Sequence, residues 1–308
     1  MGFVIISTQS RQANISIGVT KKNTEKDGDI EMKFTKMQGC GNDYVYIDAT
    51  KEIPQEADKL AIRVSDRHYG IGSDGLIMIC SSELADFRMV MFNADGSESE
   101  MCGNGIRCFG KFVYDHGLTD KKELAVETIA GIKYLKLIEE NGVITGVTVD
   151  MGKPVTRAEE IPVVAEGNPV LHYPITVQGQ EYRISCASMG NPHATVYVED
   201  TVSLDLEAIG PHFENHEVFP RRVNTEFVQL ISRKHIRMRV WERGSGETWA
   251  CGTGACACAY VSMLNGYVDN EVEVEMRGGS VIIRYDEMDG HIYMTGPAVT
   301  TFEGEFYE

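Results

Sequence analysis

The sequence predicts an α/β (α+β) protein of two pseudo-symmetric domains that arose by internal duplication. Three observations support this prediction. The chain has 308 residues, about twice the roughly 150 of an average domain. Its second half repeats landmarks of its first half at a constant shift of 149 residues. In both halves, segments with the two-residue period of a strand precede segments with helical spacing of apolar residues.

At this shift, the two halves of the sequence align without a gap. Three pairs of dipeptides coincide at this shift: Gly41-Asn42 with Gly190-Asn191, Arg88-Met89 with Arg237-Met238, and Cys102-Gly103 with Cys251-Gly252. Within residues 86–105, six of twenty positions match their counterparts in the second half, where chance gives about one. One coincidence could be noise, but three landmarks at one shift indicate a duplicated domain.

Each copy of the repeat begins with a strand and a turn. Apolar residues alternate over residues 87–92 and, in the same phase, over residues 236–240, which is the period of a strand. The turns that follow are Ala94-Asp95-Gly96-Ser97 and Arg243-Gly244-Ser245-Gly246. After each turn the sequence continues with Cys-Gly-x-Gly and a helical segment.

The two predicted helices differ in apolar pattern. In the first, Ile106, Phe109 and Val113 share one face, and Gly117 suits the left-handed position that ends a helix. The second, residues 255–264, is apolar nearly all round and is therefore predicted to be a buried central helix. Further strands are predicted at 124–126, 132–138, 143–149, 272–276, 280–285 and 291–294.

We predict two domains, residues 32–150 and 151–308, with the boundary near Gly152-Lys153-Pro154. Residues 1–31 have no counterpart in the second half and are expected to be an N-terminal extension or sequence upstream of a start at Met32. The final strand, about residues 297–308, is a candidate to pack back on the first domain.

Composition excludes several classes of protein. The hydrophobic content of 43% and charged content of 24% are ordinary for a globular chain. The net charge is −17 and the basic residues are scattered, so no nucleic-acid partner is expected. No apolar run approaches the roughly 18 residues of a membrane span, and the N-terminus lacks the pattern of a signal peptide. We therefore expect a cytoplasmic protein that does not bind membranes.

The eight cysteines are expected to be reduced thiols in that compartment. No Cys-x-x-Cys pair occurs, so no metal site is expected. Cys102 and Cys251 each precede a predicted helix, where the helix dipole and unpaired amides favour the thiolate. The glycines that follow let an anion such as a carboxylate approach the backbone. For one such cysteine alone, a small buried residue in a tight turn is the better interpretation, but two copies at symmetric positions favour a functional pair.

Two helix starts that face each other across a cleft suit the inversion of a stereocentre. A thiolate on one side removes an α-proton, and a thiol on the other side delivers a proton to the opposite face. The converging helix N-termini can stabilise the negative charge that develops on the substrate carboxylate.

Six runs of sequence resemble the diaminopimelate epimerase family: residues 34–43, 92–98, 102–108, 188–193, 222–224 and 242–255. The resemblance covers nearly all of residues 32–308, in order. It implies two domains, each a mostly antiparallel sheet wrapped around a central helix, with the active site in the interdomain cleft. It also implies conversion of L,L- to meso-diaminopimelate, in lysine and peptidoglycan-precursor biosynthesis, without pyridoxal phosphate or another cofactor.

The resemblance implies roles for individual residues. Cys102 and Cys251 would be the acid/base pair. The residues that would hold the carboxylate at the reacting centre are Gly103, Asn104, Gly252 and Thr253. Amide side chains that would bind the rest of the substrate are Asn42, Asn93, Asn191 and Asn224.

Three further residues complete the predicted site. Arg243 can hold the distal carboxylate with its planar fork, and Glu242 can accept the substrate ammonium. His193, next to Asn191-Pro192, is expected to support the protonation state of a cysteine. Each of these residues, taken alone, has an ordinary alternative: an Asn in a turn, a solvated Glu-Arg pair, or a structural histidine.

Two positions depart from the family pattern. Gly75 stands where many members carry a glutamine, and Cys40 stands where an aliphatic residue is common, close to Asn42. Both changes affect the expected substrate contacts and leave the two cysteines in place.

Three other interpretations stay open at the level of sequence. A proline or hydroxyproline racemase would keep both cysteines but would have no use for Arg243 and four asparagines at a distal site. A non-catalytic carboxylate-binding protein would need only the helix starts. A thiol redox protein is disfavoured because neither cysteine has a resolving partner. A homodimer is also left open.

Overall fold

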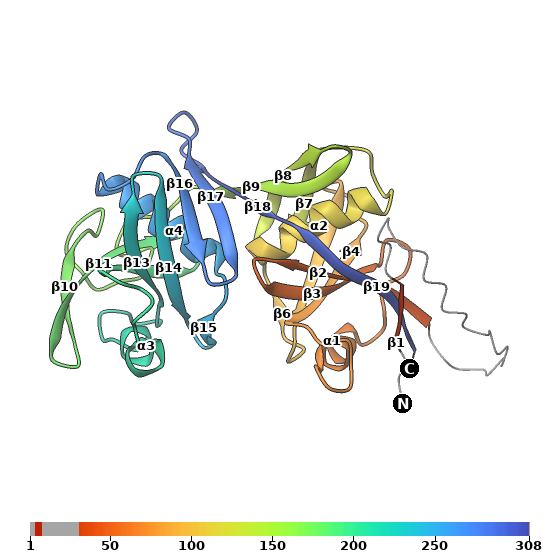
Figure 1. Cartoon of the computed structure of the whole chain (residues 1–308), viewed down its shortest axis with the longest axis horizontal. Helices are drawn as coiled ribbons and strands as arrows, with labels where there is room; N and C mark the ends of the chain where they lie inside the picture. The colour runs from red at the N-terminus through yellow and green to blue at the C-terminus, as the bar shows by residue number, and fades with distance from the viewer. Residues whose placement is uncertain (1–3, 8–30, 308) are drawn as a thin grey trace.

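The computed structural model describes residues 4–7 and 31–307, so most of the predicted extension 1–31 lies outside the described residues. The described part contains four helices and nineteen strands, joined by strand pairing into one continuous sheet. Figure 1 shows two halves side by side, each with its strands curled around one long helix. The fold class predicted from the sequence is therefore confirmed.

The first half contains ten elements, which in order are β2 (Glu31–Gly39), β3 (Asn42–Asp48), α1 (Ala57–Ser65), β4 (Gly75–Cys80), β5 (Phe87–Asn93), β6 (Glu98–Ser99), α2 (Gly103–Asp115), β7 (Glu123–Thr128), β8 (Gly131–Glu140) and β9 (Val143–Gly152). Most neighbouring strands pair antiparallel; β3 with β4 and β5 with β7 are parallel.

The second half begins with an additional strand, β10 (Tyr173–Val177), and then repeats this order with β11 (Gln180–Ser188), β12 (Pro192–Tyr197), α3 (Leu206–Glu214), β13 (Asn224–Ser232), β14 (His235–Glu242), β15 (Gly246–Thr248), α4 (Gly252–Leu264), β16 (Glu271–Met276), β17 (Gly279–Tyr285) and β18 (Ile292–Pro297). Its parallel pairs, β12 with β13 and β14 with β16, are the counterparts of those in the first half. The bounds of α1 and α3, of α2 and α4, and of β2 and β11 each differ by the shift seen in the sequence.

Two pairings join the halves. β9 runs across the predicted boundary between residues 150 and 151 and pairs antiparallel with β18. The last strand, β19 (Val299–Tyr307), then crosses the first half, where it pairs with β2 (Figure 1). Within the predicted extension, β1 (Val4–Ser7) pairs with β19. Strand pairing therefore joins the two halves into one sheet.

The two long helices form the centre of the core. α4 buries residues on every side, as its apolar sequence predicts, and α2 buries its first eleven residues. Gly117 and Gly266 adopt left-handed conformations directly after these helices. One apolar cluster contains residues of both helices and of the strands around them, while α1 and α3 pack on separate clusters at the outside. The core thus fixes the N-termini of α2 and α4 relative to each other.

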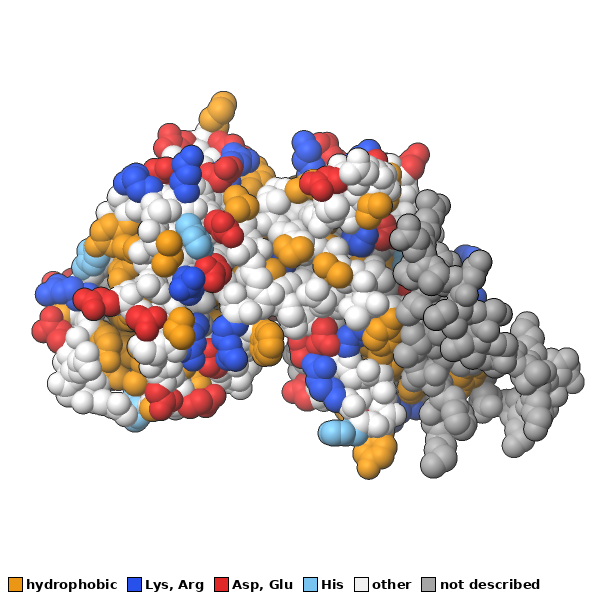
Figure 2. Space-filling view, viewed as in Figure 1, with side chains coloured by type: hydrophobic (Ala, Val, Ile, Leu, Met, Phe, Trp, Pro, Cys, Tyr) orange, Lys and Arg blue, Asp and Glu red, His pale blue; other side chains and the backbone are white. Residues whose placement is uncertain are grey.

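The surface carries mixed charge. Acidic and basic side chains are interspersed over the face shown in Figure 2, and a notch separates the two halves at its lower edge. Among the helices of residues 31–307, none is long and apolar enough to cross a membrane.

Candidate active site

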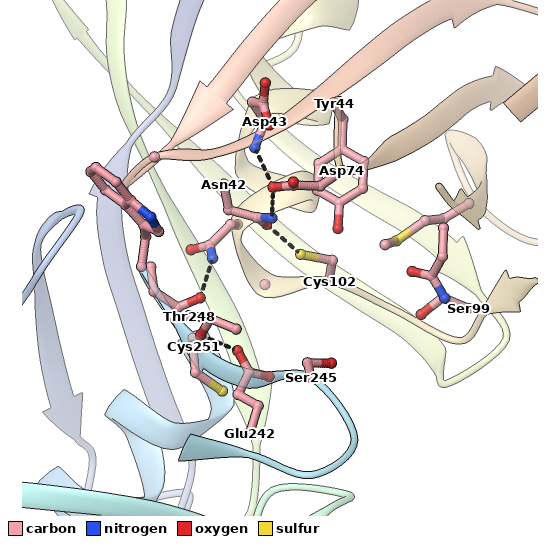
Figure 3. A pocket seen from close by; sticks show the side chains of 18 of the residues that line it. Asn42, Asp43, Tyr44, Asp74, Ser99, Cys102, Glu242, Ser245, Thr248 and Cys251 are labelled. Carbon is pink, nitrogen blue, oxygen red and sulfur yellow. Dashed lines mark hydrogen bonds between the residues drawn. The ribbon is translucent and has the colours of Figure 1, made fainter. Parts of the chain in front are cut away.

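A cleft of about 1480 Å³ lies between the halves and is lined by residues of both. Ten of the site residues predicted from the sequence line it: Asn42, Asn93, Cys102, Gly103, Asn104, Asn191, Glu242, Cys251, Gly252 and Thr253. The other three, His193, Asn224 and Arg243, lie outside this lining. Figure 3 shows Cys102 and Cys251 on opposite sides of the pocket.

Cys102 and Cys251 occupy the same structural position in their halves. Each is the N-cap of its helix, in an extended conformation with φ of −125° and −121°, respectively. Each sulfur accepts a hydrogen bond from the third helical amide, Gly105 N or Gly254 N, at 3.4 Å. An N-cap side chain normally supplies this acceptor through oxygen. Here sulfur takes that place, so each thiol lies at the positive end of a helix dipole.

The first residues of the two helices are in contact. A Cβ built on Gly103 would lie 3.7 Å from Gly252 Cα and 3.0 Å from Met294 Cε. Because neither glycine has a side chain, the free amides of both helix N-termini open onto the same space. Unpaired amides at a helix N-terminus form an anion site, and two such sets converge here.

Polar groups of β3 and of the loop before β4 surround Cys102. Its thiol donates to Asn42 Oδ1 at 3.2 Å, and Asn42 Nδ2 donates to Asp74 Oδ2 at 2.7 Å (Figure 3). Burial raises the pKa of the Cys102 thiol, while the Gly105 amide and the Tyr44 hydroxyl lower it. The network holds the sulfur at the edge of the cleft.

Carboxylates surround Cys251 instead. Burial raises the pKa of this thiol well above its usual value, and the negative charges of Glu242 and Glu226 raise it further. Hydrogen bonds from the Thr253 hydroxyl and the Gly254 amide oppose the increase. The surroundings of Cys102 therefore oppose its ionisation less than the two carboxylates oppose the ionisation of Cys251.

His193 is completely buried behind Cys251. Its Nδ1 lies 2.7 Å from Glu226 Oε1, and its Nε2 lies 2.9 Å from Asn191 Oδ1. Glu226 Oε1 would also lie 2.6 Å from a Cβ on Gly254, so that glycine lets the carboxylate reach the first turn of α4. Both ring nitrogens are thus occupied by Glu226 and Asn191, and the carboxylate lies between the histidine and the helix that bears Cys251.

Glu242 and Arg243 diverge at the end of β14. Glu242 faces the cleft and accepts from Thr248 Oγ1 at 2.5 Å (Figure 3). Arg243 is exposed, and its Nη1 donates to the carbonyl of Arg221 at 3.1 Å. Asn224 is buried and bridges two backbones, because its Nδ2 donates to Pro192 O and its Oδ1 accepts from Arg243 N. In this structure Asn224 therefore holds the turn that carries Glu242.

The cleft contains residues that the sequence analysis missed. Tyr44 and Asp74 flank Asn42 (Figure 3), and Asp43 and Asp74 share the guanidinium of Arg67. Trp249 lines the mouth with its ring against Gly41 of the other half. Tyr44 directly follows the motif 34–43, so its position next to Asn42 is visible in the sequence. Asp74 comes beside these residues only through the parallel pairing of β3 with β4.

The two departures from the family pattern have structural consequences. A Cβ on Gly75 would lie 2.1 Å from Phe92 O and 3.0 Å from the Tyr44 ring, so the backbone and Tyr44 occupy the space for a side chain. Cys40 adopts a left-handed conformation in the turn between β2 and β3 and is buried. The other five cysteines outside the site, Cys80, Cys108, Cys186, Cys256 and Cys258, are also buried and free.

Comparison with known proteins agrees with this geometry. The family model described as diaminopimelate epimerase matches residues 34–157 and 185–301. Diaminopimelate epimerase of Methanococcus maripaludis strain S2 is 56% identical over 274 residues, covering 89% of this chain and 99% of that protein. The diaminopimelate epimerase of Desulfovibrio desulfuricans is 54% identical over 284 residues, covering 90% of this chain and 99% of its own.

Solved structures of low sequence identity share the fold. A hydroxyproline epimerase from Agrobacterium vitis gives a TM-score of 0.62 at 14% identity, covering 90% of this chain and 91% of its own. A probable proline racemase from Agrobacterium radiobacter gives 0.64 at 14% identity, covering 88% and 92%.

The duplicated fold, with a cysteine at each of two facing helix starts, defines an isomerase of the class that works with paired acid/base residues and without a cofactor. Within this class, the chain belongs to the diaminopimelate epimerase family.

Proposed function

We propose that this protein epimerises L,L-diaminopimelate to meso-diaminopimelate by a two-base mechanism. The observation that carries the proposal is the pair Cys102 and Cys251, each the N-cap of a central helix and each facing the same cleft. Identity above 50% to curated relatives over nearly their full length supports the choice of substrate.

In the proposed reaction, the α-carboxylate binds to the free amides at Gly103, Asn104, Gly252 and Thr253. The Cys102 thiolate takes the α-hydrogen as a proton, and the electron pair of the C–H bond moves toward the carboxylate. The Cys251 thiol then gives its proton to the opposite face of the same carbon. The product leaves Cys102 as a thiol and Cys251 as a thiolate, which is the starting state for the reverse reaction. The helix amides stabilise the charge that develops on the carboxylate.

The remaining polar residues are proposed to select the length and the distal end of the substrate. Asn42, Asn93 and Asn191 line the cleft and offer neutral donors and acceptors. Glu242 is positioned to accept an ammonium group. Arg243 now donates to Arg221 O at the surface, so holding the distal carboxylate requires its side chain to turn toward the cleft when substrate binds. His193 is proposed to act through Glu226 on the side of Cys251.

The decisive experiment is incubation of the purified, reduced protein with L,L-diaminopimelate in D₂O. The proposal expects meso product that carries deuterium at the inverted carbon, because the proton delivered comes from a solvent-exchanged thiol. Epimerisation of proline or hydroxyproline, with none of diaminopimelate, would favour the proline racemase alternative. Binding without exchange at the α-carbon would favour a carboxylate-binding protein.

We propose a cytoplasmic role in lysine and peptidoglycan-precursor biosynthesis, which follows from the proposed substrate. The homodimer left open by the sequence stays a prediction, and sedimentation equilibrium would decide it.

A further inference from the structure

Arg107 is an arginine with no exposed surface, in the second turn of α2. Arginine is almost never fully buried unless it is paired with an acid, and its guanidinium keeps its charge inside a protein. A cation near a helix N-terminus also opposes the helix dipole. Helix stability therefore does not explain the presence of this side chain.

The partners of the guanidinium are all neutral. Nη1 donates to Gly103 O at 3.1 Å, Nη2 to Asn104 Oδ1 at 2.9 Å, and Nε to Pro297 O at 3.2 Å. The remaining contacts are with sulfur: Met294 Sδ at 3.7 Å and Cys40 Sγ at 3.6 Å. Among the ion pairs of residues 31–307, none involves Arg107. A full positive charge is thus buried against the first turn of α2 without a compensating carboxylate.

The guanidinium also connects the two helix starts. Asn104, which accepts from Arg107, donates through Nδ2 to Ala250 O at 3.3 Å. Ala250 directly precedes Cys251. A chain of two hydrogen bonds therefore runs from Arg107 to the backbone beside the second cysteine, underneath the point where Gly103 and Gly252 meet.

A buried cation without an acid is costly unless negative charge comes close to it. Cys40, whose sulfur contacts Nη2, is a buried thiol whose pKa is raised by burial, so the groups at the cleft that can supply that charge are a Cys102 thiolate and an anion bound at the two helix N-termini. We propose that Arg107 is a positioning residue of the epimerase proposed above: its guanidinium supplies a fixed positive charge beside the first turn of α2 that favours the thiolate form of Cys102 and, through Asn104, fixes the spacing of the two helix starts.

The electrostatics of the cysteines are consistent with this role. Burial raises the pKa of Cys102, and this increase is opposed by the Gly105 amide, the Tyr44 hydroxyl, the Asn104 amide and the charge of Arg107. The strongest charges acting on Cys251 are instead the carboxylates of Glu242 and Glu226. The other titratable groups near Cys102 are Tyr44 and Tyr46 on β3, Cys108 on α2 and, through Asn42, Asp74. Of the groups facing Cys102, Arg107 carries the positive charge.

The test measures the pH dependence of Cys102 alkylation by iodoacetamide, read by peptide mass spectrometry in the full chain. Arg107→Gln removes the charge and keeps some hydrogen bonding. We expect Cys102 to react about tenfold more slowly at pH 7, with its profile displaced to higher pH. Arg107→Lys keeps the charge but not the planar fork, so it should retain the wild-type profile while turnover falls at least tenfold.

Lys111→Met is the matched control. Lys111 is a second buried cation on α2, one turn further from Cys102, and it is paired with Asp115. Its removal should leave the profile in place. An unchanged profile in folded Arg107→Gln, or an Arg107→Lys profile displaced to higher pH, would overturn the inference. Alkylation requires no substrate, so these shifts can be measured even in a protein that is inactive on diaminopimelate. Failure of the proposed function and failure of the proposed role of Arg107 are therefore distinguishable.

Discussion

Gly103 and Gly252, the first residues of α2 and α4, lie so close that a Cβ added to Gly103 would be 3.7 Å from the Cα of Gly252. They are equivalent positions of the duplicated sequence. The contact brings the unpaired amides of two helices to one point, which neither half could provide alone. Duplication has thus placed two helix N-termini side by side at the interface of the two copies, where we propose that the substrate carboxylate binds.

This contact predicts the effect of a single methyl group. In Gly103→Ala the new Cβ would lie 3.0 Å from Met294 Cε, the end of a flexible side chain that can move. The fold should survive, but the methyl group would press on the start of the facing helix and displace the amides that we propose bind the carboxylate, so kcat/KM should fall about 10- to 100-fold. Gly110→Ala on the same helix is the control, because its Cβ would lie 3.0 Å from two leucine methyl groups away from the cleft. Equal losses of activity in both variants would contradict the assignment.

The charges around the two cysteines predict unequal reactivity. Iodoacetamide should modify Cys102 before Cys251, because the thiolate is the reactive form and Glu242 and Glu226 oppose ionisation of Cys251. Glu242→Gln removes one negative charge and should therefore lower the pKa of Cys251 and increase its alkylation rate, with little effect at Cys102. Time-resolved peptide mass spectrometry measures both rates. Faster modification of Cys251 in the wild type would contradict this asymmetry.

The pair His193 and Glu226 predicts a large stability effect. Both side chains are completely buried, and Glu226 Oε2 has no hydrogen-bond partner among the described residues. Glu226→Gln replaces the buried carboxylate beside His193 with a neutral amide and should lower the free energy of unfolding by about 3 kcal/mol. Glu275→Gln is the control: its pairing with Arg237 is about one third exposed, so the loss should be below about 1 kcal/mol. Urea denaturation compares them, and similar losses would contradict a large contribution of the buried pair to stability.

A structural feature could be predicted from the sequence when the residues that determine it are close together in the chain. The strand and helix periods are local, so the repeat, the helix starts at Cys102 and Cys251, and the buried nature of α4 could be predicted and are confirmed. Gly117 could also be predicted, because a left-handed residue after a helix requires only local conformation.

The direction of a side chain depends on partners that are distant in sequence. Nothing near Arg107 indicates that it is buried, because its partners Pro297 and Met294 come from β18 in the second half. Asp74 reaches Asn42 only through the pairing of β3 with β4. Arg243 was predicted from a motif, yet its orientation is set by Arg221 O, a contact that no motif describes.

The position of Arg243 makes its proposed role testable. If the side chain turns into the cleft to bind the distal carboxylate, Arg243→Lys should raise KM and lower kcat/KM roughly ten- to a hundredfold, the value of a charged hydrogen bond. Arg222→Lys is the control, because Arg222 is half exposed and pairs with Glu214. Steady-state kinetics with L,L-diaminopimelate distinguish them. Wild-type kinetics in Arg243→Lys would assign Arg243 to the surface.

The last prediction separates the roles of the two cysteines. Each direction of epimerisation uses a different cysteine as base, and serine holds its proton much more tightly than cysteine. Cys102→Ser and Cys251→Ser should therefore each lose reversible epimerisation by orders of magnitude.

Elimination from a diaminopimelate analogue with a leaving group on the β-carbon needs only one base. It should survive in each single variant for the stereoisomer whose α-hydrogen faces the remaining cysteine, so the preferred isomer should swap between Cys102→Ser and Cys251→Ser. Release of the leaving group from each isomer measures this preference. If both variants processed the same isomer equally well, the two bases would not act on opposite faces of the substrate. The symmetric placement of the sulfurs at two helix N-caps argues that they do.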